Sequence, residues 1–115
     1  MKSDNVVVTK SFCFAVRIVR LYRYLSEVKK EVVLSRQLLR SGTSIGANIK
    51  EAIRGQTKAD FHAKMNIALK EASESEYWLD LMYQSDIINY REYNSIQTQC
   101  VELIKILTAI VKNSE

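Results

Sequence analysis

Apolar residues recur at intervals of three and four positions along nearly the whole chain, and none of its 115 residues is proline. Such spacing gathers apolar side chains on one face of an α-helix, whereas a half-buried strand alternates them at every second position. Only three glycines interrupt the pattern. The sequence therefore predicts an all-α protein and argues against a turn-rich β-sandwich.

Four segments carry this repeat, and we predict helices at residues 9–27, 36–54, 58–85 and 90–113. Ser35 is the expected N-cap of the second helix. Thr57 with Asp60, and Asn89 with Glu92, have the spacing of capping boxes before the third and fourth helices. The short connections between these helices force neighbours to run antiparallel. The prediction is an up-down-up-down four-helix bundle that forms a single domain over residues 1–115.

The first predicted helix has a wider apolar surface than one buried face requires. Beside its main row lies a second row of apolar and aromatic residues, which are Phe12, Ala15, Val19 and Tyr22. An ordinary amphipathic helix buries one stripe, so a second stripe indicates a helix that touches more than one neighbour.

Few residues in this chain are suited to catalysis or metal binding. His62 is the single histidine, and the two cysteines, Cys13 and Cys100, lie far apart and outside any metal-binding spacing. We expect free thiols rather than a disulfide, no metal, no cofactor and no enzymatic activity. No apolar run approaches the ~20 residues that cross a bilayer, and the first residues lack the apolar core of a secretory signal. The expected location is the cytoplasm, with no membrane partner.

The charges are divided unequally along the chain. Residues 1–57 hold eleven basic and four acidic residues, net +7, whereas residues 58–115 hold six and nine, net −3. This division indicates either a basic surface for a polyanion or a basic half that meets the acidic half of a neighbouring subunit. The third interpretation is an unevenly charged, solvated surface.

The basic residues of the first half lie on helical stripes. Arg36, Arg40, Lys50 and Arg54 share one stripe of the second helix, and Arg17 and Arg20, with Lys10, lie on the first. Together they are the candidate nucleic-acid-binding residues, because each phosphate that they neutralise adds sequence-independent affinity. The alternative is that they are solvated or that they pair with Glu71, Glu74 or Asp80 of a neighbouring chain.

Small and polar residues replace leucines in the middle of the second helix. Ser41, Ser44 and Asn48 share a face there, next to two glycines that each cost about 1 kcal/mol in a helix interior. We expect these residues to set packing and register against a neighbouring helix, with ligand contact as the alternative. Glu76 lies on a largely apolar row of the third helix and is expected to pair with Arg40, Ser44 or Asn48.

Ile67 and Trp78 lie among charged residues on another face of the third helix. A large apolar side chain in such surroundings is typical of an anchor at a protein interface. These two residues therefore predict a contact surface of a homo-oligomer.

Two stretches of sequence carry a family resemblance. One is Gln37–Ala52, QLLRSGTSIGANIKEA, and the other is Ala68–Ala72, ALKEA, followed by Glu76–Leu79, EYWL. Together they resemble the signatures of bacterial four-helix-bundle proteins first noticed in intervening sequences of 23S rRNA genes, which carry an S23-like ribosomal-protein label. The resemblance covers nearly the whole chain. Lys50 and Ala52 stand where many members have alanine and glycine.

The resemblance implies a left-handed bundle that assembles as a homopentamer. It also implies kinship with the accessory protein of diversity-generating retroelements, a similar fold that binds nucleic acid and a reverse transcriptase. A reverse-transcriptase-like protein is therefore one conceivable partner, although no defined activity follows. We expect a non-enzymatic homo-oligomer that binds RNA or DNA without sequence specificity. The alternative is an assembly or adapter module for a protein partner, without nucleic-acid binding.

Overall fold

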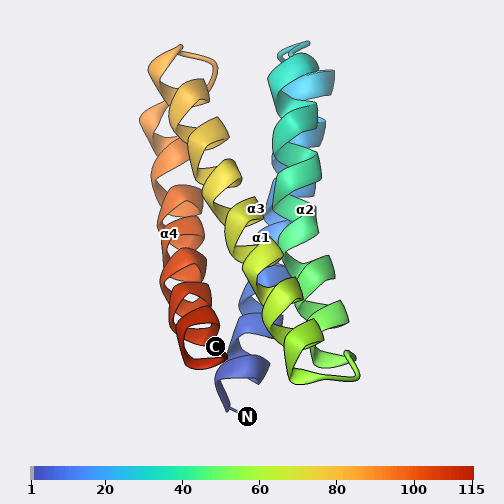
Figure 1. Ribbon diagram of the computed structural model, residues 1–115. Coiled ribbons are helices and arrows are strands. Elements are labelled where there is room, and N and C mark those ends of the chain that lie inside the picture. The colour runs from blue at the N-terminus through green and yellow to red at the C-terminus, as the bar shows by residue number, and fades with distance from the viewer. Residues whose placement is uncertain (1) are drawn as a thin grey trace.

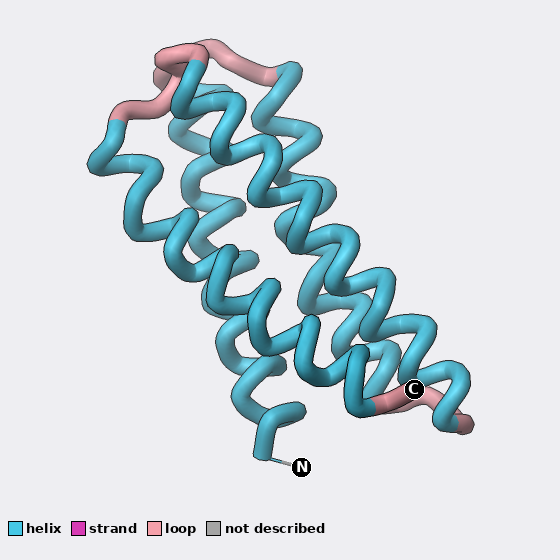
Figure 2. The backbone as a smooth tube through the Cα atoms, turned by 60° about the vertical axis from the view of Figure 1, so that its left-hand side comes forward, coloured by secondary structure: helices cyan, strands magenta, loops and turns pink. Residues whose placement is uncertain are grey.

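A computed structural model describes residues 2–115 of the chain, with side chains from residue 6 onward. It contains four α-helices, which are α1 (Lys2–Glu27), α2 (Val33–Ile53), α3 (Lys58–Gln84) and α4 (Tyr90–Asn113). Figure 2 shows them joined by short loops at the two ends, and no strand occurs within the described part of the chain. The predicted all-α, four-helix architecture is confirmed.

The helices pack as an elongated bundle of 44 × 19 × 18 Å. α1 packs against α2, α2 against α3, α3 against α4, and α4 against α1. Figure 1 shows that consecutive helices run in opposite directions and that both chain termini lie at the same end. Each helix therefore borders two others in an up-down-up-down arrangement. The left-handed sense of the bundle stays a prediction.

α1 begins seven residues earlier than the predicted start at Thr9. The residues before Thr9 include three valines, an asparagine and an aspartate, all of which have low helix propensity. Val7 is nevertheless fully buried and continues the row of Phe14 and Ile18 toward the N-terminus. Burial of this side chain, which propensity does not register, favours the additional helical turns.

The start of α2 also differs from the prediction, because Ser35 is not its N-cap. Val32 occupies the N-cap position without a side-chain hydrogen bond. The Glu31 carboxylate instead accepts hydrogen bonds from the backbone N–H groups of Leu34 and Ser35. Ser35 lies buried within the first turn, and its hydroxyl donates to the carbonyl oxygen of Glu31. A carboxylate at a helix N-terminus also interacts favourably with the helix dipole.

The caps of α3 and α4 lie where the sequence predicts them. Thr57 Oγ1 accepts from the backbone N–H of Asp60 at 3.0 Å. Asn89 and Glu92 form a complete capping box, in which both hydrogen bonds measure 2.8 Å. These caps satisfy backbone donors that have no partner within the helix.

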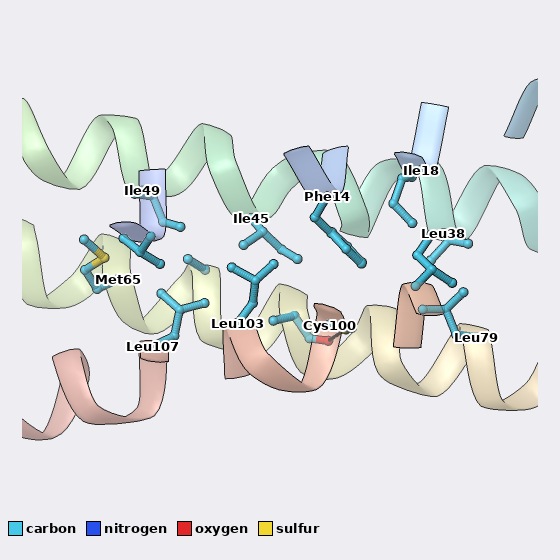
Figure 3. Packing of buried hydrophobic residues seen from close by; sticks show 14 of the residues in the cluster. Phe14, Ile18, Leu38, Ile45, Ile49, Met65, Leu79, Cys100, Leu103 and Leu107 are labelled. Carbon is cyan, nitrogen blue, oxygen red and sulfur yellow. Dashed lines mark hydrogen bonds between the residues drawn. The ribbon is translucent and has the colours of Figure 1, made fainter. Parts of the chain in front are cut away.

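The core is a continuous column of side chains from all four helices, several of which Figure 3 labels. Phe14 and Ile18 of α1 point toward Leu38 and Ile45 of α2, and Leu79 of α3 lies near them (Figure 3). All five are buried. Across the described residues, no helix combines the length and the hydropathy of a membrane span.

Candidate functional site

The predicted basic stripe of α2 lies on the outside of the bundle. Arg36, Lys50 and Arg54 are exposed there, and so is Arg20 of α1. Among the residues whose side chains are described, none of these four takes part in an ion pair. Their charges are thus available to a partner in solution.

Arg17 and Arg40 belong to the same predicted set but have partners within the chain. Arg17 Nη1 donates to Ser95 Oγ at 2.9 Å and to Gln99 Oε1 at 3.0 Å, which links α1 to α4. Arg40 Nη1 lies 3.1 Å from Glu71 Oε2, and Arg40 Nη2 pairs with Glu74 Oε2, which links α2 to α3. The expected pairing of Arg40 with these carboxylates therefore occurs within one chain.

Trp78 is hydrogen-bonded to one of the two carboxylates that pair with Arg40. The indole Nε1–H of Trp78 donates to Glu74 Oε2 at 2.9 Å. This hydrogen bond is the largest cause that lowers the pKa of Glu74, and the Arg40 guanidinium lowers it further. In return, the hydrogen bond to Glu74 raises the pKa of Arg40. The second predicted interface residue, Ile67, lies on the same helix with 40% of its surface exposed.

Two further ion pairs join the basic half of the chain to the acidic half. Lys10 Nζ lies 3.0 Å from Glu102 Oε1, and Lys29 Nζ lies 3.9 Å from Glu92 Oε1. Both pairs are partly exposed, so each contributes little stability. They do pair basic residues of the first half with acidic residues of α4, so part of the unequal charge is balanced within a single chain.

The small polar residues of α2 differ in their hydrogen-bond partners. Ser41 is buried, and its Oγ lies 2.8 Å from Ser75 Oγ of α3, a contact between two helices. Ser44 Oγ instead donates to the carbonyl oxygen of Arg40, and Asn48 Nδ2 donates to that of Ser44. Among the described contacts, Ser44 and Asn48 therefore set no register through a hydrogen bond to another helix, because each donates to the carbonyl four residues earlier on its own helix.

Glu76 also departs from its predicted role. No ion pair or side-chain hydrogen bond joins it to Arg40, Ser44 or Asn48 in the described part of the structure. Glu76 is only half-buried, so water reduces its need for a partner. Its neighbour Asp80 accepts hydrogen bonds from Tyr93 Oη at 2.6 Å and from Gln97 Nε2 at 2.8 Å.

The two helical glycines of α2 face α1. A β-carbon on Gly42 would lie 2.8 Å from Cγ1 of Ile18, and one on Gly46 would lie 3.3 Å from Ser11 Oγ. The absence of side chains at these positions lets the two helices approach closely. Close packing accounts for Gly42 without a ligand.

An apolar groove between α1 and α2 is a feature that the sequence reasoning did not assign to a site. Its lining residues include Val8 and Phe12 of α1 and Ala47 and Ile53 of α2. Phe12 is 69% exposed, although it lies in the middle of a helix. The second apolar row of the first predicted helix, which contains Phe12, was the available signal.

The residues with reactive side chains are dispersed. His62 Nδ1 lies 2.8 Å from Ser114 Oγ near the end of the bundle. Cys13 is exposed, Cys100 is buried, and both are free thiols. Burial, the largest cause, raises the pKa of Cys100 to about 12. From residue 2 to residue 115, no group of three histidine, cysteine or acidic residues is placed to hold a metal ion.

Known proteins share both the sequence signatures and the fold of this chain. The family model described as 23S rRNA-intervening sequence protein matches residues 3–109. The chain belongs to this family. A crystal structure at 1.70 Å from Bacteroides thetaiotaomicron, of a protein with unknown function from the S23 ribosomal protein family, has 55% sequence identity and a TM-score of 0.93. The match covers 96% of the present chain and 98% of the other.

Membership of the 23S rRNA-intervening sequence protein family confirms the resemblance carried by Gln37–Ala52 and Ala68–Leu79. The comparison with curated proteins gives no match. The family description refers to the rRNA intervening sequence, and the solved relative is itself described as having unknown function. The function of this member must therefore be argued from its own surface.

Proposed function

We propose that this member of the 23S rRNA-intervening sequence protein family is a non-enzymatic homo-oligomer that binds RNA or DNA without sequence specificity. Four of the predicted contact residues, Arg20, Arg36, Lys50 and Arg54, provide the basic surface. Arg17 and Arg40 contribute to the local potential but are held by partners within the chain.

The observation that supports this proposal most directly is the unbalanced charge on the outside of α1 and α2. The part of α1, α2 and their connecting loop with described side chains contains three carboxylates, which are Glu27, Glu31 and Glu51. Two of them interact with groups other than the arginines. Glu31 caps α2, and Glu51 lies 3.1 Å from Lys64 of α3. The exposed arginines therefore face solvent with little local compensation.

A surface of this kind attracts phosphate groups through their charge rather than through base edges. Each phosphate contact releases a condensed counterion, so affinity falls as salt concentration rises. Assembly multiplies the effect, because a pentamer of chains with net charge +4 would carry about +20. Few exposed aromatic side chains lie among the arginines to stack on bases, which favours a non-specific mode of binding.

The test is a salt titration of binding to a fluorescently labelled single-stranded RNA and to a duplex DNA of random sequence. Wild-type protein should bind both at about 50 mM salt. The logarithm of its association constant should then fall linearly with the logarithm of the salt concentration. The double variant Arg20→Gln/Arg36→Gln should bind more weakly, with the salt slope reduced by about 2, one for each lost contact.

Lys70→Gln/Lys105→Gln is the matched control. Both lysines are exposed on the acidic half of the chain, and the double variant loses the same two positive charges. If the slope depends on net charge alone, the two double variants will behave identically and the α1–α2 surface is not the binding site. Absence of binding at low salt overturns the nucleic-acid proposal altogether.

The second candidate function is an assembly or adapter module for a protein partner. The exposed groove around Phe12 favours it, because an uncovered apolar surface of this kind is typical of an interaction site. This candidate predicts an oligomer that dissociates as salt rises and that retains no RNA or DNA at any salt concentration. The same titration, followed by light scattering, separates it from nucleic-acid binding.

A further inference from the structure

The groove between α1 and α2 combines an apolar floor with positively charged residues. Val8, Phe12 and Ile53 line it, and all three are at least 40% exposed. Lys50 and Arg54 are the charged residues among the described lining. A matching occupant must therefore present a large apolar side chain next to negative charge.

A second surface of the same chain has this complementary character. We use the term α3 ridge for Ile67, Glu71, Glu74 and Trp78. Ile67 and the half-buried Trp78 supply apolar area, and Trp78 packs edge-on against Tyr77 with ring centroids 5.1 Å apart. Glu71 and Glu74 share a single arginine, so the ridge and its arginine together retain one negative charge.

The groove and the ridge lie on neighbouring sides of the bundle. The groove lies between α1 and α2, whereas the pairing of Arg40 with Glu71 and Glu74 places the ridge along the α2–α3 edge. One copy can thus present its ridge to the groove of a second copy and still keep its own groove open. A contact between two different surfaces is heterologous, and it forms a closed ring when the rotation between copies closes.

We infer that the α1–α2 groove of one chain binds the α3 ridge of a second copy of the same chain. The inference rests on the homo-oligomeric part of the proposed function and specifies its two contact surfaces. Lys50 and Arg54 approach Glu71 and Glu74 of the second copy in this arrangement, while Phe12 packs beside Ile67 and Trp78. In the assembled protein Lys50 and Arg54 therefore belong to the subunit contact, and Arg20 and Arg36, which do not line the groove, remain open to nucleic acid.

A pair of surface variants tests the two contacts separately. Phe12→Lys blocks the groove, Ile67→Lys blocks the ridge, and both positions are exposed enough for lysine to reach water. Val28→Lys is the matched control, because Val28 is 67% exposed in the loop after α1, away from both surfaces. Sedimentation equilibrium at low salt gives the mass of each protein, and circular dichroism verifies its helicity. Phe12→Ser replaces Phe12→Lys if the latter loses helicity.

The expected masses follow from the heterologous contact. Each blocked variant alone should be monomeric, whereas Val28→Lys should keep the wild-type mass. An equimolar mixture of Phe12→Lys and Ile67→Lys should form a heterodimer of twice the monomer mass, because the ridge of the first still fits the groove of the second. The heterodimer should not grow further, since its remaining surfaces are both blocked.

Three results would overturn the inference. Wild-type mass for either blocked variant shows that the mutated surface is not used. A mixture that stays monomeric excludes contact between groove and ridge. If only Phe12→Lys dissociates, two grooves face each other instead.

The failure of this inference and the failure of the proposed function have different signatures. A wild-type protein that is monomeric at all concentrations contradicts the homo-oligomer itself and, with it, the groove–ridge contact. An oligomer that the two variants leave intact contradicts the contact surfaces alone. RNA and DNA binding by Arg20 and Arg36 is measured independently in the salt titration, because neither arginine lines the groove.

Discussion

Gly42 of α2 lies directly against Ile18 of α1, so close that a β-carbon at Gly42 would come within 2.8 Å of Ile18 Cγ1 and 2.9 Å of Cγ2. Ile18 is fully buried and cannot move aside into solvent. Glycine is unfavourable in a helix interior by about 1 kcal/mol relative to alanine. Its presence here is explained by the close approach of the two helices.

Gly42→Ala should therefore destabilise the protein, even though alanine is the better helix former. Overpacking of a buried contact costs about 1–3 kcal/mol, which outweighs the gain in propensity. Urea denaturation followed by circular dichroism measures the difference. Gly46→Ala is the control, because its β-carbon would meet nothing closer than Ser11 Oγ at 3.3 Å. Because 3.3 Å is still a tight contact, Gly46→Ala is expected to cost less stability than Gly42→Ala, and equal losses at both glycines would contradict this account.

The hydrogen bond between Ser41 and Ser75 provides a second prediction. Both hydroxyl groups are buried, and their oxygens lie 2.8 Å apart between α2 and α3. Ser75 Oγ also donates to the carbonyl oxygen of Glu71 at 2.9 Å, so Ser41 supplies the proton of the shared bond. Ser75→Ala leaves the Ser41 hydroxyl without this acceptor and should cost about 1–2 kcal/mol, whereas Ser41→Ala leaves Ser75 bonded to Glu71 and should cost less. The double variant Ser41→Ala/Ser75→Ala should cost less than the sum of the two, because no hydroxyl is left without its partner. A double-mutant cycle in urea measures the coupling, and strict additivity would contradict a direct bond.

The positions of α3 and α4 are predictable because local and long-range signals agree there. A row of apolar residues three and four positions apart follows a capping residue in each case, and the helices begin where Thr57 and Asn89 cap them. α1 is less predictable, because the burial of Val7 depends on a neighbouring helix. Glu31 likewise caps α2 through a side chain that reaches forward to the backbone of Leu34 and Ser35, which the preference for serine as N-cap does not indicate.

The candidate site is harder to predict than the fold, since sequence spacing shows which residues share a face but not which atoms they contact. Ser44 and Asn48 lie on the predicted face but bond to their own helix. Arg36 and Arg40 occupy the same stripe, yet Arg36 is exposed without an ion pair among the described residues, whereas Arg40 is held by two carboxylates. The open groove at Phe12 depends on how α1 and α2 pack, so the apolar row alone could not locate it.

The two cysteines should differ strongly in reactivity. Cys100 is buried and its Sγ donates to the carbonyl oxygen of Ala72 at 3.3 Å, while Cys13 is exposed. Burial, with smaller contributions from the charges of Glu76 and Asp80, raises the pKa of Cys100 to about 12. At neutral pH an aromatic disulfide reagent should modify one thiol rapidly in the native protein and both in denaturant. Rapid modification of two thiols in the native state would contradict the burial.

The same raised pKa predicts a loss of stability in alkali. Above about pH 9 the unfolded chain releases the thiol proton that the folded protein still holds, so ionisation favours unfolding. The free energy of unfolding should fall by up to about 1.4 kcal/mol for each pH unit above that point. Urea denaturation between about pH 8 and pH 11 measures this slope. Cys100→Ala, which has no thiol, should show a smaller slope from a lower starting stability.

The lowered pKa of Glu74 predicts that the stability of the fold falls in acid, whereas the raised pKa of Cys100 predicts that it falls in alkali. The indole N–H of Trp78 and the guanidinium of Arg40 lower its pKa, with the Trp78 hydrogen bond as the largest cause. A carboxylate with a lowered pKa stabilises the fold above its unfolded-state pKa, and that contribution is lost as the pH falls through the folded-state value. At neutral pH the contribution is below about 1 kcal/mol, because the pair with Arg40 is partly exposed.

Trp78→Phe separates this effect from general acid sensitivity, because phenylalanine keeps an aromatic ring but cannot donate to Glu74. Both Trp78→Phe and Glu74→Gln should lose less stability than wild type between about pH 5 and pH 3. The double variant should behave like Glu74→Gln alone, because without a carboxylate at position 74 the indole has no titrating group to stabilise. Thermal unfolding followed by circular dichroism across this range measures the difference. A wild-type pH dependence in Trp78→Phe would show that Arg40, rather than the indole, holds Glu74 ionised.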